Sequence, residues 1–162
     1  QANAALDQGV QASDPLFVPY VAGERTPFVD PGLRGAWRGL GLDTSREAML
    51  RRVVDGVAHA VALGIDAVIG AGAPLPDPLP LIGGGSVDAR FRQLIADASG
   101  RRLAPRDQPD AAVVGAALLA LGVSASPVSR ADDVIEPLSS AHDLLAVRQQ
   151  RLVEYVQHGH EH

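Results

Sequence analysis

The sequence predicts an α/β fold built as one domain. Short apolar segments bounded by turn residues alternate with longer segments in which apolar residues recur at helical spacing. This alternation is typical of strands packed against helices. The composition agrees, because 46% of the 162 residues are hydrophobic, which is enough for one buried core.

The N-terminal part is predicted to be a lead-in followed by an extended segment. The first ~12 residues are expected to be frayed. Residues 15–21 are apolar and bounded by turn formers, which favours a short strand or an extended edge. Residues 23–27 predict a loop, because Gly and Pro are dense there. Its Glu24 and Arg25 are expected to be a surface ion pair rather than catalytic groups.

A first long helix is predicted to begin at residues 44–45. Thr44 with Glu47 three positions later fits a capping box. One face of the helix is expected to be apolar and buried, through Met49, Leu50, Val53, Val54, Val57, Val61 and Ile65. Arg51, Asp55 and His59 recur four residues apart on another face. Such a stripe is more often a solvated surface, with ion pairs of about 0.3 kcal/mol each.

The second half continues the alternation. Residues 79–82 predict a strand, and a helix through Phe91 is expected to stop at Gly100. Leu103 is expected in a short strand. The helix predicted over residues 110–121 is small or apolar all round, so we expect it to be buried, with Ala116 and Leu119 inside. A last helix is predicted over residues 140–157.

Composition excludes several kinds of chemistry. There is no Cys, so thiolate metal sites and cysteine nucleophiles are excluded. All 14 basic residues are Arg, so a Walker A lysine and a Schiff-base lysine are excluded. A net charge of −5 with few aromatic residues argues against nucleic-acid binding. Apolar runs broken before ~18 residues predict no membrane span. No basic-then-apolar leader is seen, and the missing initiator Met predicts a processed or partial chain.

The glycine run after residue 82 is the most informative candidate site: Gly83, Gly84, Gly85 and Ser86. A buried strand that ends in glycines and leads into a helix lets a nucleotide approach bare backbone and unpaired N–H groups. The alternative is a plain strand-to-helix turn, because the spacing is not that of a dinucleotide fingerprint. The histidines of residues 158–162 suggest a metal site, although a flexible terminus is the simpler interpretation.

Several segments in this order resemble the FGGY family of carbohydrate kinases, most closely its xylulokinases. The segments are residues 16–28 (LFVPYVAGERTPF), 30–40, the helix with Val53, Val54 and Asp55, residues 82–97 (IGGG…FRQLIAD), 110–119, and Glu136-Pro137 with Tyr155. They cover roughly residues 15–157. Four residues depart from the family pattern. Ala48 stands where His is usual, Arg52 where Ala or Ser is usual, Phe91 where Trp is common, and Ala89 where glycerol kinase has Asn.

The resemblance implies an incomplete ribonuclease-H-like lobe of the actin/hexokinase type, belonging to a two-lobed cytoplasmic kinase that phosphorylates D-xylulose or a related ketose or polyol. It implies ATP and Mg²⁺ as cofactors of the parent enzyme. Gly83, Gly84, Gly85 and Ser86 would contact the nucleotide, Asp43 and Glu47 would lie by the ribose or adenine, and Gly115 would let its helix pack closely. It divides the chain into a lead-in (1–14), a nucleotide-binding lobe (15–126), a closing segment with the last helix (127–157) and a tail (158–162).

No catalytic or metal-binding residue is expected in this chain, because the catalytic Asp and two phosphate loops of the family are not found in it. We therefore expect the chain alone to be inert. A missing N-terminal lobe, ATP or ADP, and the sugar are its implied partners. The alternative is a degenerate lobe kept as a non-catalytic interaction or dimerisation module. A homodimer is expected, because losing a partner lobe would bare an apolar wall near Tyr20, Trp37 and residues 83–86.

Overall fold

The computed structural model describes Gly9, Gln11 and residues 13–84, 87–106, 110–123 and 134–158. The predicted α/β alternation is confirmed within these residues. The elements follow in the order β1 (Leu16–Val18), β2 (Ala36–Arg38), α2 (Arg46–Gly70), β3 (Leu79–Leu81), α3 (Ala89–Ser99), β4 (Leu103–Pro105), α4 (Ala111–Leu121) and α5 (Ser139–His158). Only β2 has no counterpart among the predicted elements.

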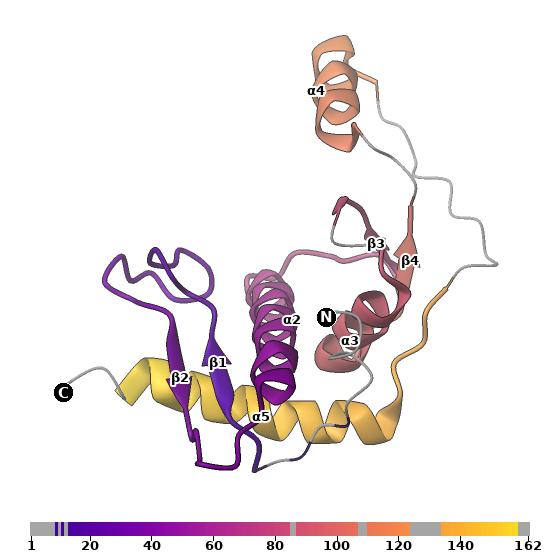
Figure 1. The fold of residues 1–162 in the computed structure, drawn as a ribbon. Coiled ribbons are helices and arrows are strands. Elements are labelled where there is room, and N and C mark those ends of the chain that lie inside the picture. Colours follow the sequence, from indigo (N-terminus) through magenta and orange to yellow (C-terminus); the bar gives the residue numbers. More distant parts are fainter. Residues whose placement is uncertain are drawn as a thin grey trace.

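Two short sheets flank the central helix. β1 pairs antiparallel with β2, with Phe17 opposite Trp37, and the two rings pack 4.8 Å apart between centroids. β3 pairs parallel with β4, and α3 connects them, so this half is the expected strand–helix–strand unit. Figure 1 shows α2 standing on α5, with β1 and β2 on one side of α2 and α3, β3 and β4 on the other.

Two apolar clusters hold these elements together. The first lies where α2, α3, β4 and α5 meet, and it consists of Ala58, Ala62, Leu94, Ile95, Ala96, Ala98, Leu103 and Leu145. The second joins β1 and the following loop to the end of α5 through Val18, Tyr20, Leu33, Leu152 and Val156. Gly56 allows α2 to approach β1, because a Cβ there would lie 2.5 Å from the carbonyl oxygen of Phe17. α5 therefore contributes side chains to both apolar clusters.

The prediction for the two faces of α2 is wrong. The residues it buries are Arg51, Arg52, Asp55, Gly56, Ala58, His59 and Ala62. Val57 and Val61, from the predicted apolar face, keep 40% and 38% of their surface exposed. Small residues on the buried face let neighbouring elements approach, while its charged groups pair with one another. No described element fully covers the valine side.

The start of α2 also differs from the prediction. Ser45, rather than Thr44, caps the helix, and its Oγ accepts from the backbone N–H of Ala48 at 3.1 Å. Thr44 instead accepts from the backbone N–H of Gly41 at 2.8 Å, so it closes the preceding turn. One local sequence window contains two hydroxyls able to cap, and the turn geometry decides between them.

The predicted burial of α4 is wrong. None of its residues is buried, and Leu119 is 84% exposed while Ala116 is also exposed. Gly115, expected to permit close packing, has no atom within 4 Å of where a Cβ would stand. Figure 1 shows α4 projecting away from the other helices. An all-round apolar helix needs neighbours on every side, and the described part of this chain provides none.

α2 is also long and apolar enough to cross a membrane, with a mean hydropathy of 1.6 over its best 18-residue window. The prediction that every apolar run is too short for a membrane span is therefore wrong for this helix. A core helix of a soluble protein passes the same test. α2 contacts α3 and β1, and its Arg51, Arg52 and Asp55 are buried and paired inside the protein, which agrees with a core position.

Candidate functional site

The predicted nucleotide turn lies between β3 and α3. Gly83 has φ of +102°, a conformation that residues with a side chain rarely adopt. No atom of the described residues lies within 4 Å of the position where a Cβ of Gly84 would stand, and both glycines are exposed. The positive φ thus falls on Gly83, and Gly84 leaves open space for a ligand. Gly85 and Ser86 lie outside the described residues.

The N-terminus of α3, next to this turn, already holds a carboxylate. Asp88 Oδ1 accepts from the backbone N–H groups of Arg90 at 2.8 Å and of Phe91 at 3.3 Å. Its Oδ2 lies 3.1 Å from Arg90 Nη2. The side-chain hydrogen bond from Arg90 lowers the pKa of Asp88, so the group is ionised at neutral pH. A phosphate would have to displace this carboxylate, so the turn fits the uncharged adenosine part of a nucleotide better than its phosphates.

Asp43 and Glu47, the other predicted contacts, lie elsewhere. Both are exposed at the N-terminal end of α2, whereas the glycine turn follows β3, which the chain reaches from the C-terminal end of α2. The helix has 25 residues, which is about 37 Å, and Figure 1 shows the chain running from the far end of α2 to β3. The structure therefore places the two parts of the predicted site at different ends of α2.

Neither a metal cluster nor the predicted ion pair is found in the described residues. No group of three His, Asp or Glu side chains that could hold a metal lies in that part of the chain. The histidine tail beyond residue 158 is outside that range. Glu24 does not pair with the Arg25 side chain. Its Oε1 accepts from the backbone N–H groups of Arg25 at 2.6 Å and Thr26 at 3.0 Å, which shapes the loop.

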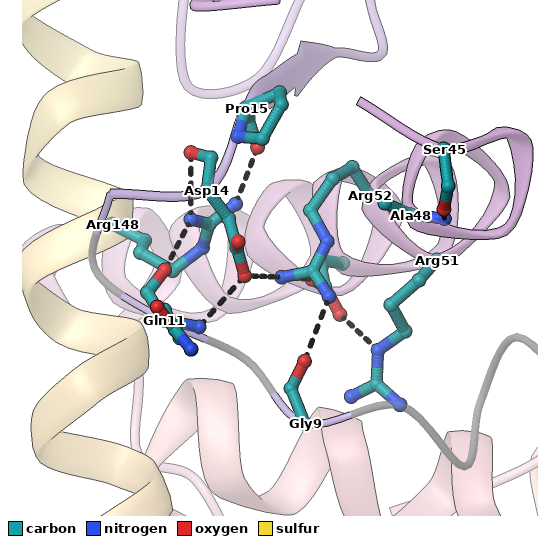
Figure 2. Close-up of polar contacts among 10 residues, drawn as sticks. Gly9, Gln11, Asp14, Pro15, Ser45, Ala48, Arg51, Arg52 and Arg148 are labelled. Atoms are coloured by element: carbon teal, nitrogen blue, oxygen red, sulfur yellow. Dashed lines mark hydrogen bonds and ion pairs between the residues drawn. The ribbon is translucent and has the colours of Figure 1, made fainter. Parts of the chain in front are cut away.

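The densest polar cluster was not predicted, and it is buried between α2, α5 and the lead-in (Figure 2). Arg52 Nη1 lies 2.9 Å from Asp14 Oδ2 and 3.0 Å from Asp55 Oδ2. Arg51 Nε donates to Asp55 Oδ1 at 2.9 Å. Arg148, from α5, donates to three backbone carbonyls of residues 11–15. The stripe expected to face solvent is therefore a buried ion network.

His59 continues the network along α2. It is 1% exposed, and neither ring nitrogen has a hydrogen-bond partner in the described part of the chain. Burial lowers the pKa of His59 to about 4, against the opposing attraction of Asp55. The imidazole is therefore neutral near pH 7. Burial likewise raises the pKa of the Tyr20 hydroxyl to about 12. Tyr20 is only 2% exposed, so it does not belong to the bare apolar wall that was expected around it.

The sequence held one signal for this network. Arg52 departs from the pattern of the resembled family, and an arginine where a small residue is usual calls for an acid partner. That partner, Asp14, is 38 residues away. No periodicity connects the two, and the lead-in was expected to be frayed.

Comparison with known proteins agrees with the resemblance. Residues 1–122 match the C-terminal domain of the FGGY family of carbohydrate kinases. The xylulose kinase of Escherichia coli (strain K12) is 36% identical over 143 residues, covering 86% of this chain and 29% of the relative. That of Klebsiella pneumoniae is 40% identical over 120 residues, covering 72% and 24%. The chain thus spans less than a third of the length of these relatives.

Solved structures agree on the fold. A kinase from Brucella ovis described as a xyloylose kinase superposes with a TM-score of 0.76 at 27% identity, covering 96% of this chain and 34% of its own. A ligand-bound xylulose kinase from Lactobacillus acidophilus gives 0.79 at 21%, covering 96% and 33%. These neighbours confirm the ribonuclease-H-like, actin/hexokinase-type fold class, despite the exposure of α4. The chain belongs to the FGGY family of carbohydrate kinases, as part of the family's C-terminal domain.

Proposed function

We propose that this chain is the nucleotide-side lobe of an ATP-dependent sugar kinase that phosphorylates D-xylulose or a related ketose or polyol. The turn from β3 through Gly83 and Gly84 to α3 is the observation that carries the proposal. It offers an exposed glycine backbone with open space beside it, within a domain that matches sugar kinases. We place the adenosine against this turn, including Gly85 and Ser86, and leave Asp43 and Glu47 out of the site.

The chain alone is expected not to transfer phosphate. Phosphoryl transfer needs phosphate clamps, a metal and a base that takes the proton of the sugar hydroxyl. We assign these, with Mg²⁺ and most of the sugar pocket, to a second lobe. One lobe supplies one wall of a cleft, so it binds without catalysing. The non-catalytic module is the less favoured alternative, because the relatives are described as kinases.

We further propose a cytoplasmic, dimeric parent enzyme. The absence of Cys fits a reducing compartment. Self-association is supported by apolar side chains exposed on α2 and α4, among them Val57, Val68, Val113 and Leu121, because such surfaces are usually covered by a partner.

A titration of the ¹⁵N-labelled chain with ATP tests the nucleotide turn. We expect shifts at the amides of Gly83, Gly84 and Val87, with a dissociation constant near ~1 mM, little Mg²⁺ dependence, and no response to xylulose. Gly84→Val should abolish the response, because its side chain would fill the space left for the ligand. The matched control is Gly64→Val, another site with no atom within 4 Å, and it should bind like the wild type. Shifts centred on Asp43 and Glu47, or a response to xylulose alone, would refute the assignment.

A further inference from the structure

Gly9, Gln11 and residues 13–15 lie against α2 and α5 and are held there by two arginines. We call these five residues the strap. Arg52 of α2 donates to Asp14 Oδ2 at 2.9 Å and to the carbonyl oxygen of Gly9 at 3.3 Å. Arg148 of α5 donates to the carbonyl oxygens of Gln11 at 2.9 Å, Asp14 at 3.0 Å and Pro15 at 2.7 Å.

The strap is also folded upon itself. The backbone N–H of Gln11 donates to Asp14 Oδ2 at 2.7 Å, and the N–H of Asp14 donates to the carbonyl oxygen of Gln11 at 3.2 Å. The Asp14 carboxylate therefore closes a turn and receives Arg52 at the same time. Figure 2 shows both guanidinium groups pointing at this turn from their two helices.

The two arginines depend on the strap to different degrees. Arg52 and Arg148 are 2% and 1% exposed, so each needs acceptors inside the protein. Without the strap, Arg52 would keep Asp55 at 3.0 Å. Arg148 has only strap carbonyls as hydrogen-bond acceptors among the described residues. Burial and the neighbouring charge of Arg52 lower the pKa of Arg148 to about 10, which still leaves it a cation at neutral pH.

We infer that the strap is a built-in clamp that fastens α2 to α5, with Arg52 and Arg148 as its positioning residues. Because each guanidinium comes from a different helix and both bind one turn, the strap bridges the two helices. The inference is independent of the proposed function, since it concerns only contacts within this chain.

Amide hydrogen exchange of the whole chain tests the clamp. In the wild type, the amides of Gln11 and Asp14 should exchange at least tenfold more slowly than in an unstructured chain. Arg148→Met should remove most of that protection and raise exchange in the middle of α5. Arg101→Met is the matched control, because Arg101 is exposed and has no contact with the strap, and it should leave the strap amides unchanged.

Asp14→Ala provides a test that does not require a buried residue to change, because its side chain is 28% exposed. We expect it to speed exchange at Gln11 by about tenfold, which corresponds to the loss of one charge-assisted network. Combined with Arg52→Met, it should add less than the sum of the two single changes. Unprotected strap amides in the wild type, or strictly additive effects of Asp14→Ala and Arg52→Met, would overturn the inference.

Discussion

His59 shows how one buried side chain can make the stability of the domain depend on pH. Its pKa is lowered from 6.5 to about 4 by burial. The unfolded chain therefore binds a proton between these values that the folded chain does not, and folding stability falls as the pH drops through that window. The full effect is roughly 3 kcal/mol below pH 4, most of which develops between pH 6.5 and 4.

The variant His59→Gln tests this pH dependence, because glutamine does not titrate. The free energy of unfolding of the wild type should fall by about 2 kcal/mol more than that of the variant between pH 7 and pH 5. Urea unfolding at a series of pH values measures both proteins, and carboxylates common to them cancel in the difference. Parallel curves would mean that His59 is solvated in the folded state.

For single residues, the sequence pattern showed correctly which side chains share a helix face, but it did not show whether that face is buried. Arg51, Asp55 and His59 were recognised as one stripe, but the pattern could not distinguish a solvated stripe from a buried one. The distinction depends on Asp14 and Arg148, which approach from distant parts of the chain. The glycine turn could be predicted because the range of φ open to glycine is a local property, and Gly83 does adopt a positive φ.

The start of α2 shows that a local sequence motif does not by itself determine where a helix begins. Thr44 and Glu47 formed the better motif, yet Ser45 accepts the capping bond from Ala48. Ser45→Ala should cost about 1 kcal/mol of stability. Thr44→Ala should cost less than half of that, because only the bond to Gly41 is lost. Urea denaturation of both variants measures the difference, and the reverse order would restore the capping box that the sequence suggested.

Element existence was far more predictable than element environment. Within the described residues, the apolar periodicity or turn chemistry located all four helices and three of the four strands. β2 was missed because Ala36–Arg38 is short and follows loop-forming glycines, and its pairing with β1 is a tertiary contact. The C-terminal stop of α3 at Gly100 followed from left-handed backbone, with φ of +62°.

Across the whole molecule, several apolar side chains are exposed in this chain that the proposed longer kinase would cover. Val57 and Val61 on α2 and Leu119 on α4 are all at least 38% exposed. The proposed parent enzyme would cover such surfaces through its other parts or through a second copy. In this chain, the two apolar clusters and the strap contribute to stability together with local interactions such as the Ser45 cap.

An exposed leucine of α4 and a buried leucine of the second cluster should therefore contribute differently to stability. Leu119→Gln should change the free energy of unfolding of this chain by no more than about 0.5 kcal/mol, because Leu119 is 84% exposed on α4. Leu152→Ala should cost about 2–5 kcal/mol, because Leu152 is fully buried in the second cluster. Thermal or urea unfolding measures both, with Leu152→Ala showing that the method detects a true core position. A cost for Leu119→Gln comparable to that of Leu152→Ala would mean that α4 packs against a neighbour in solution, in this chain or in a second copy. A concentration-dependent midpoint would then identify the second copy, because stabilisation by association grows with protein concentration.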